Sequence, residues 1–257
     1  MRDPRHIVIT GASSGIGAAL VKVYAGPGVT LSLIGRDKGR LETEAAAARI
    51  AGASVTTGLI DVTDATSMEN WLHERDAAQP VDLVIANAGI SAGTDGGPED
   101  AAQTRRILAT NMDGAVNTVM PLLPAMRARK RGQVALMASL AGFRGFAGAP
   151  AYCASKAALR VWGEALRDDL HKDGVEVCVI CPGYVATNMT RVNKFHMPWK
   201  LSAPGTAAHI RKGLARNAAR LAFPFPTYAI VWALAALPPG LTGPVLRRLP
   251  RKAKSEG

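Results

Sequence analysis

The chain is poor in cysteine. It has three cysteines in 257 residues, at positions 153, 178 and 181, and they form no set of metal ligands. Cys178 and Cys181 fall on a predicted buried strand, without the helix start that activates a redox pair. We therefore expect reduced thiols and no metal site, as in a cytoplasmic protein.

Acidic residues are almost missing from the last part of the chain. Residues 1–176 hold 19 Lys and Arg against 19 Asp and Glu, whereas residues 177–257 hold 12 against one, so the formal charge of +11 belongs to the tail. Residues 221–246 are uncharged, but prolines divide them, and the longest helical part, Thr227 to Leu237, is too short to cross a bilayer. The start of the chain passes almost directly into a predicted strand, which leaves no room for a signal peptide.

The first residues predict a strand, a glycine-rich turn and a helix. His6 to Thr10 is apolar, the run GASSGIG follows at 11–17, and a helix rich in Ala, Leu and Val comes next. Glycines let the backbone approach a pyrophosphate, and a helix start offers it unpaired N–H groups and partial positive charge. The spacing differs from the more familiar G-x-G-x-x-G, and alone it also fits a flexible turn.

Tyr152 and Lys156 lie four residues apart and therefore on one face of a predicted helix. A neighbouring ammonium can help to make a phenol acidic, although lowering its pKa by about three units requires about 4 kcal/mol. The alternative is an amphipathic core tyrosine beside a solvated lysine.

The order of predicted elements indicates one α/β domain over residues 1–257. Helices are predicted from Gly15, Lys38, Asp64, Glu99 (to about Met126), Tyr152 and Ala203, and strands begin near His6, Val29, Ala53, Val81, Gln133, Val175 and Leu221. This alternation predicts a Rossmann-like, doubly wound parallel sheet of about seven strands with helices on both faces.

Short motifs follow one another at the ends of these strands, and with them the chain resembles the short-chain dehydrogenase/reductase family from Ile7 to about Thr190. The motifs are Thr10-Gly11-x-x-x-Gly15-Ile16-Gly17, Asp61-Val62, Asn87-Ala88-Gly89, Asn111, Ser139, Tyr152-x-x-x-Lys156 and Pro182-Gly183 followed by Thr187. The resemblance implies hydride transfer between a nicotinamide and a carbonyl or alcohol carbon.

The resemblance also implies four catalytic roles. Tyr152 would be the general acid or base at the substrate oxygen, and Lys156 would hold the ribose and, with the oxidised nicotinamide, lower the pKa of the tyrosine. Ser139 would donate a second hydrogen bond to that oxygen, and Asn111 would anchor a water next to Lys156. Alternatively, Ser139 caps a turn and Asn111 satisfies nearby backbone.

The end of the second strand bears on the choice of cofactor. Relatives that prefer NAD carry an acidic residue there, whereas this chain has Gly35 and then Arg36, whose guanidinium suits a 2′-phosphate. NADP(H) is therefore expected and NAD(H) remains possible, because Asp37 is a competing partner for Arg36 or a substitute ribose ligand. The implied cofactor-binding residues are Gly11, Ser13, Ser14, Gly15, Ile16, Gly17, Arg36, Asp61, Val62, Asn87, Ala88, Gly89, Tyr152, Lys156, Pro182, Gly183, Val185 and Thr187.

The segments that would enclose the substrate are mostly apolar. They are residues 140–150 and 190–201, the second within a lid region at 186–220. They favour a lipid-, steroid- or acyl-like substrate, although the same side chains also fit lid packing. Relatives pair through the helices near Glu99 and Tyr152, so a homodimer or homotetramer is implied. The rival function is a dinucleotide-sensing regulator or scaffold without turnover.

Three alternatives remain for the apolar and basic extension at 221–257. It packs on the lid or on another subunit, or it attaches peripherally to an anionic membrane through leucines, Tyr228 and Trp232 flanked by basic clusters. Nucleic acid is not expected, because no recognition motif accompanies the charge.

Overall fold

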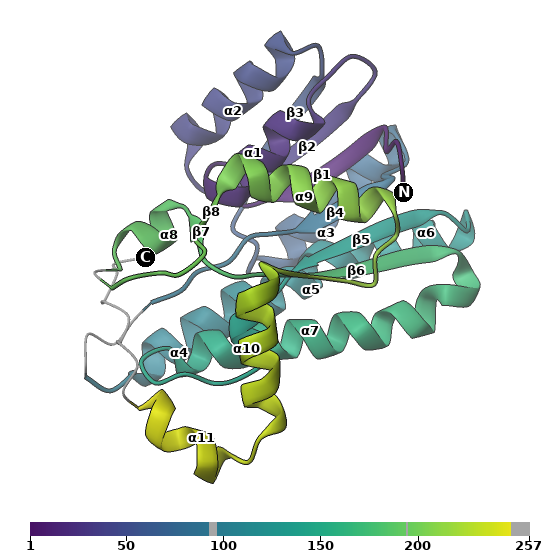
Figure 1. The fold of residues 1–257 in the computed structure, drawn as a ribbon. Coiled ribbons are helices and arrows are strands. Elements are labelled where there is room, and N and C mark those ends of the chain that lie inside the picture. The colour runs from purple at the N-terminus through teal and green to yellow at the C-terminus, as the bar shows by residue number, and fades with distance from the viewer. Residues whose placement is uncertain (93–96, 194, 248–257) are drawn as a thin grey trace.

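A seven-stranded parallel sheet forms the centre of the computed structural model, which describes residues 1–92, 97–193 and 195–247 (Figure 1). The strand order is β3-β2-β1-β4-β5-β6-β9. The strands are β1 (His6–Thr10), β2 (Thr30–Gly35), β3 (Ser54–Leu59), β4 (Leu83–Ala86), β5 (Gly132–Met137), β6 (Val175–Pro182) and β9 (Arg220–Phe223). The order reverses beside β1, so the predicted doubly wound sheet is confirmed.

Two apolar cores lie on the two faces of the sheet, because successive strand residues point to opposite sides. In β1, Ile7 and Ile9 join the core under α1 (Gly15–Tyr24), α2 (Lys38–Ile50) and α9 (Ala203–Ala215). Val8 joins the other core, under α3 (Ala65–Ala78), α5 (Gly114–Val119), α6 (Leu123–Ala128) and α7 (Pro150–Leu170). Cys153, Cys178 and Cys181 are buried thiols.

Several helices begin where the sequence provides an N-cap. The side chains of Asp37, Asp64 and Asp100 accept hydrogen bonds from the backbone N–H three residues further on. These caps start α2, α3 and α4 (Ala101–Leu108), because they satisfy an N–H group that the helix itself leaves unpaired.

The prediction of one continuous helix from Glu99 to Met126 is wrong, because this segment is divided into several shorter helices and turns. After α4 the chain forms a π-helical turn, Ala109–Asp113, then α5, then a 3₁₀ turn, Met120–Leu122, and then α6. Pro121 lies in the 3₁₀ turn and removes a backbone N–H from the α-helical pattern. The π turn carries Asn111, whose side chain is hydrogen-bonded to another segment.

The lid region contains elements that the sequence did not predict. A two-stranded sheet pairs β7 (Val185–Ala186) with β8 (Leu201–Ser202). Between them lies α8 (Asn188–Arg191), which Thr187 and Thr190 start with a capping box. This small sheet ties the chain after β6 to the start of α9.

The C-terminal extension forms two helices that project from one end of the sheet (Figure 1). The helix expected over 227–237 is α10 (Phe225–Ala236), and α11 (Pro239–Leu246) follows it with Pro244 inside. Val231 of α10 is buried in the second core, and the Tyr228 ring lies 5.4 Å from that of Phe143. No helix in the described part of the chain combines the length and apolarity that a bilayer crossing needs. The basic end at 248–257 lies outside the described residues.

Candidate active site

The glycine turn after β1 is held against the end of β4. The hydroxyl of Thr10 accepts hydrogen bonds from the backbone N–H groups of Asn87 and Ala88, both at 3.1 Å. Asn87 Nδ2 donates to the carbonyls of Thr10 (2.9 Å) and Gly11 (3.3 Å). These four bonds fix the turn and the Asn87-Ala88-Gly89 segment as one unit.

Three glycines of the turn are required by its geometry. Gly11 and Gly15 adopt φ values of +64° and +57°, which favour glycine. A Cβ on Gly17 would stand 2.1 Å from the Gly11 carbonyl oxygen. α1 begins at Gly15, so its first backbone N–H groups face the turn. The cradle fits a phosphate group and leaves no room for larger residues.

Asn111 is completely buried and is held by the segment after β4. Its Oδ1 accepts from Ile90 N at 2.7 Å, and its Nδ2 donates to Ile90 O at 3.0 Å and to Ser155 Oγ at 2.9 Å. The Asn111 side chain therefore satisfies nearby backbone groups, as the alternative interpretation of this residue predicted. A Cβ on Gly89 would stand 3.0 Å from Asn111 Oδ1 and 3.3 Å from Lys156 Nζ, so both side chains lie beside Gly89.

Lys156 lines the pocket but is almost completely buried, so it is not the solvated lysine of the alternative interpretation. Its Nζ donates to the carbonyl of Met137 at 2.7 Å and lies 5.8 Å from the centre of the Tyr152 ring. Burial lowers the pKa of Lys156 to about 8, because an ammonium loses hydration there. The neutral and charged forms are thus close in free energy near physiological pH.

Ser139 and Tyr152 line the same cavity, and Ser139 interacts with the Tyr152 side chain. Ser139 Oγ also accepts from Ala141 N at 3.1 Å and lies 3.4 Å from the Pro182 carbonyl, so it caps the turn after β5 as well. Burial raises the pKa of Tyr152, and the bond from Ser139 offsets part of that rise. Within the protein alone, burial is the largest influence on this pKa, and the lowering expected from Lys156 together with the oxidised nicotinamide stays a prediction.

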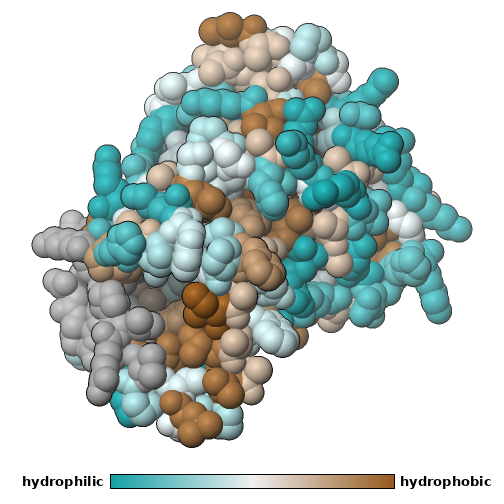
Figure 2. Space-filling view, viewed as in Figure 1, coloured by the Kyte–Doolittle hydropathy of each residue, from teal (hydrophilic) through white to brown (hydrophobic). Residues whose placement is uncertain are grey.

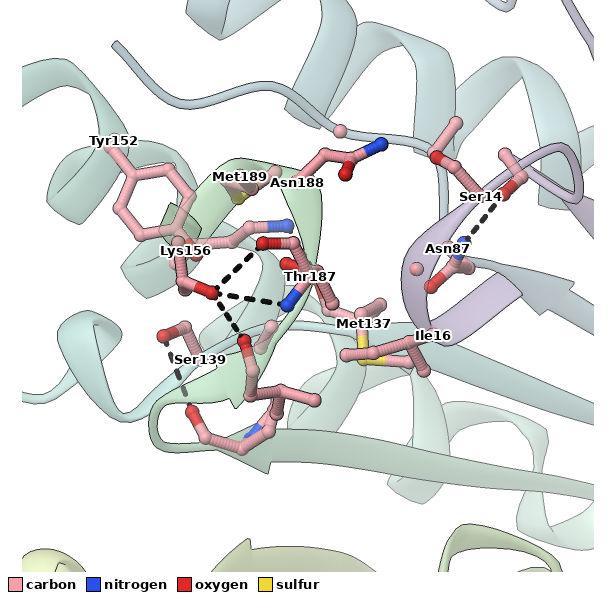
Figure 3. Close-up of a pocket in the computed structure, with 18 of the residues that line it drawn as sticks. Ser14, Ile16, Asn87, Met137, Ser139, Tyr152, Lys156, Thr187, Asn188 and Met189 are labelled. Carbon is pink, nitrogen blue, oxygen red and sulfur yellow. Dashed lines mark hydrogen bonds between the residues drawn. The ribbon is translucent and has the colours of Figure 1, made fainter. Parts of the chain in front are cut away.

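These side chains face one cavity of about 190 Å³ at the carboxyl ends of the strands. Figure 3 shows Tyr152, Lys156 and Ser139 on one side of it and Ser14, Ile16 and Asn87 on the other, with Asn188 and Met189 of α8 along its edge. The predicted residues that it brings together are Gly11, Ser14, Gly15, Ile16, Asn87, Ala88, Gly89, Ser139, Tyr152, Lys156, Pro182, Gly183, Val185 and Thr187.

The cavity closes where α8 meets the glycine turn. A Cβ on Gly15 would lie 3.1 Å from Thr187 Cγ2, so the start of α8 rests against the turn. Thr190 Oγ1 donates to the carbonyl of Val185 at 2.6 Å and accepts from Thr187 N at 3.1 Å, which fixes this short segment. Asn188, Met189 and Thr190 line the cavity; they belong to the predicted lid region, but none was predicted individually as a site residue, because their role depends on this local fold.

The remaining predicted residues lie outside the cavity lining. Asn111 and Gly17 support it from beneath, while Ser13, Arg36, Asp61 and Val62 belong to the side of β2 and β3. Small-molecule sites commonly measure about 300–1,000 Å³, so this cavity corresponds to one end of an extended ligand.

Arg36 is paired with Asp61 and not with Asp37. Its Nη1 lies 3.4 Å from Asp61 Oδ2, and the two side chains are 60% and 41% exposed. Asp37 caps α2 and binds Arg40 through Nε at 2.7 Å. Asp37 is therefore not the partner of Arg36 in this structure, and its role as a substitute ribose ligand stays a prediction.

Three supporting residues were missed by the sequence reasoning. Thr10 fixes the glycine turn, Ser155 holds Asn111, and the Met137 carbonyl receives the ammonium of Lys156. Ser155 lies three residues after Tyr152 on the same helix, so helical spacing could have indicated it. Within the described residues, no group of three or more His, Cys, Asp or Glu could hold a metal ion.

The parallel sheet, the phosphate cradle and the Ser139–Tyr152 pair above Lys156 define a class of protein, a Rossmann-type dinucleotide oxidoreductase. The family profile described as short chain dehydrogenase matches residues 5–196. The chain belongs to the short-chain dehydrogenase/reductase family, whose members act on CH–OH and C=O groups with a nicotinamide dinucleotide.

Individual relatives cover nearly the whole chain. An uncharacterized oxidoreductase of Myxococcus xanthus (strain DK1622) is 38% identical over 246 residues, 95% of this chain and 97% of the relative. The ketoacyl reductase HetN of Nostoc sp. is 31% identical over 214 residues, 82% and 74% of the two chains. The structure of a short-chain dehydrogenase from Sphingobium yanoikuyae in complex with NADPH superposes with a TM-score of 0.80, at 25% identity and 98% coverage of each chain.

Proposed function

We propose that the protein is an NADP(H)-dependent reductase that transfers a hydride between nicotinamide and the carbonyl or secondary alcohol of an apolar substrate. The observation that carries this proposal is that Ser139, Tyr152 and Lys156 line the same cavity as the glycine turn. The nicotinamide dinucleotide supplies or accepts the hydride, and the residues of this chain handle the proton and the developing charge.

Tyr152 gives its proton to the substrate oxygen in the direction of reduction. Burial raises its pKa, so the phenol is protonated at neutral pH, as a general acid must be. Ser139 donates a second hydrogen bond to the same oxygen and stabilises its alkoxide-like charge. These two roles need both hydroxyl groups to face the same point, and the placement of both residues in one cavity supports that arrangement.

Lys156 and Asn111 are assigned to proton supply. Lys156 holds the ribose hydroxyls, and its pKa of about 8 allows it to pass a proton at physiological pH. Asn111 Oδ1 lies close to Lys156 Nζ across Gly89 and anchors a water there. Together they would return a proton to Tyr152 after each turnover.

Arg36 supports the preference for NADP(H). Its side chain is largely exposed and has a weak 3.4 Å contact with Asp61, which a 2′-phosphate can replace with shorter charge-assisted bonds. The Sphingobium relative binds NADPH, which agrees with this preference. The alternative is NAD(H), with Asp61 accepting the ribose hydroxyls.

The substrate that fits best is apolar, such as an acyl, lipid or steroid carbonyl compound. Met189 and Val185 line the cavity, and Phe143 and Phe146 follow Ser139 on the same side. The phenyl rings also pack against the second core, so only part of their surface is available. The name of the Nostoc relative, a ketoacyl reductase, supports an acyl chain.

The proposed oligomer forms through α4 and α7, which pack side by side (Figure 1). Leu108, Met120 and Val161 are 37%, 46% and 55% exposed on or near these helices. Such side chains gain stability when a second subunit covers them, which favours a homodimer or homotetramer.

A substrate screen with NADPH and Tyr152→Phe tests the proposed function. Aliphatic ketones, steroid ketones and β-ketoacyl thioesters are offered, and NADPH oxidation and NADPH affinity are both measured. Turnover that falls about 10²-fold or more in Tyr152→Phe, with NADPH affinity retained, supports the enzyme. Tyr24→Phe, a buried tyrosine of α1, is the matched control and keeps its activity.

The rival function makes a different prediction in the same screen. A dinucleotide sensor binds NADPH tightly and turns over none of the substrates, and Tyr152→Phe then changes nothing that can be measured. That result would overturn the proposed reaction and leave only the cofactor site.

A further inference from the structure

The two C-terminal helices present an apolar surface to solvent. Phe225, Ile230, Trp232, Leu237 and Leu241 are 75%, 50%, 57%, 49% and 69% exposed. We call these five side chains the C-terminal apolar face. Figure 2 shows several hydrophobic residues over α10 and α11 on the face in view, although hydrophobic residues also occur elsewhere on that face.

This surface is unusual for helices that lie on the outside of a domain. An exposed helix normally has a polar side, whereas residues 221–246 carry no charged side chain. Only Val231 of α10 is buried in the core, so most of its apolar side chains face outward. A helix that is apolar all round is normally covered by protein or lipid.

The charge that follows this face in the sequence suits an anionic surface. Arg247 is exposed at the end of α11, and the sequence continues with Arg248, Arg251, Lys252 and Lys254. The only acid after Glu176 is Glu256. Each basic residue close to an anionic bilayer contributes about 1 kcal/mol of attraction, so this cluster reinforces the apolar contact.

A second copy of the chain is a poorer partner for the same face. In a two-fold symmetric contact, the face and its basic neighbours would meet themselves, and the tail offers one acid against 12 basic residues to balance them. Spanning is excluded by length, because helices of 12 and 8 residues extend about 18 and 12 Å against an apolar thickness of about 30 Å.

We propose that the C-terminal apolar face binds peripherally to the surface of a bilayer that contains anionic lipid, with α10 and α11 lying in the interface. This attachment does not depend on the proposed reaction. It would bring the substrate side of the cavity close to the lipid, because Tyr228 of α10 packs on Phe143 and Arg144 donates to Thr242 of α11 at 3.0 Å. Both contacts join the helices to the segment that follows Ser139.

Vesicle binding by the full chain tests the proposal. Wild-type protein is mixed with vesicles of phosphatidylcholine and phosphatidylglycerol, or of phosphatidylcholine alone, and sedimented. Binding is expected to the mixed vesicles, with lower binding at high salt. Leu241→Glu and Trp232→Glu should each lower the partition coefficient at least about tenfold. Ile50→Glu is the matched control, because Ile50 of α2 is 89% exposed, and it should bind like the wild type.

Tryptophan fluorescence locates the contact within the molecule. Trp199 and Trp232 are similarly exposed, at 51% and 57%, but only Trp232 belongs to the C-terminal apolar face. The emission should shift to the blue with mixed vesicles in Trp199→Phe and should lose this shift in Trp232→Phe. This readout needs no substrate, so it does not depend on whether the reductase function is correct.

Two outcomes would overturn the proposal. One is that Leu241→Glu and Ile50→Glu bind the mixed vesicles equally. The other is that wild-type protein ignores the vesicles while Trp232→Glu converts an oligomer to a monomer in sedimentation. In that case the face is an interface between copies of the chain.

Discussion

Asn111 and Lys156 approach the same side of Gly89, where a side chain would separate them. The Oδ1 atom of Asn111 and the Nζ atom of Lys156 lie 3.0 and 3.3 Å from the position that a Cβ on Gly89 would occupy. Because glycine has no Cβ, this position stays open beside the amide of Asn111 and the ammonium of Lys156. Gly89 thus leaves room for the two side chains that we assign to proton supply, in addition to the cofactor-binding role implied for its motif.

Replacing Gly89 by Ala should damage catalysis more than folding. The new methyl group would press on Asn111 and Lys156 and shift the two side chains, so we expect kcat to fall at least about tenfold with a small change in Tm. Steady-state kinetics and thermal unfolding measure the two effects. Gly145→Ala is the control, because nothing lies within 4 Å of its Cβ position. Equal kinetics in both variants would contradict the assignment.

Arg36→Ala should weaken NADPH binding and leave NADH binding nearly unchanged. Charge-assisted hydrogen bonds contribute about 1.5–3 kcal/mol, so the KM for NADPH should rise roughly 10- to 150-fold. Arg40→Ala is a matched control, since Arg40 is 58% exposed on the same segment but binds Asp37. An equal loss with both cofactors would refute the phosphate contact.

Gly35→Asp should shift the preference toward NADH. A Cβ on Gly35 would stand 3.3 Å from Ser13 and from Leu41, so the aspartate fits after small adjustments and lies beside the turn. Its carboxylate repels a 2′-phosphate and accepts the hydroxyls of an unphosphorylated ribose. Gly39→Asp adds the same charge to the first turn of α2 and serves as the control. The ratio of kcat/KM for the two cofactors is the measurement, and an unchanged ratio would count against the model of specificity.

The buried ammonium of Lys156 should make stability depend on pH. Its pKa is about 8 in the folded protein and 10.5 when unperturbed, so the unfolded chain binds more protons between these values and stability rises with pH there. The free energy of unfolding of the wild type relative to Lys156→Met should increase by up to about 3 kcal/mol between pH 8 and pH 10.5.

Denaturant unfolding at several pH values measures this difference. Burial raises the pKa of Cys178 and Cys181 to about 12, so their ionisation in the unfolded chain destabilises the protein above their ordinary pKa of 9.0. Both thiols and Tyr152 remain in Lys156→Met, so their contributions largely cancel in the comparison. A difference that stays constant or falls as pH rises would show that the lysine is hydrated.

The local signals in the sequence predicted the fold well. The predicted start of β1 at His6 and of α1 at Gly15 is confirmed, because the apolar run, the turn and the helix start each leave a local pattern. Capping aspartates made the beginnings of α2 and α3 predictable in the same way. The cavity brings Ser139, which follows β5, together with Tyr152 and Lys156 of α7, because that helix packs along β5 and β6.

Properties that depend on distant contacts could not be predicted. The π turn at Asn111 accompanies bonds to Ile90, which is 21 residues away in the sequence and belongs to another segment. The pKa of Tyr152 follows from burial, which the spacing of Tyr152 and Lys156 does not reveal. Similarly, α11 contains Pro244 and forms against Arg144, although its prolines suggested a break.

A Cβ on Gly15 would lie 3.1 Å from Thr187 Cγ2, so α8 begins beside the glycine turn. A dinucleotide bound at that turn would lie against Thr187, Asn188 and Met189, and these residues would form part of the surface that the substrate meets. The surface that binds the substrate would therefore be complete only after the coenzyme has bound. Steady-state kinetics should therefore follow a compulsory sequence, with the coenzyme arriving first and departing last.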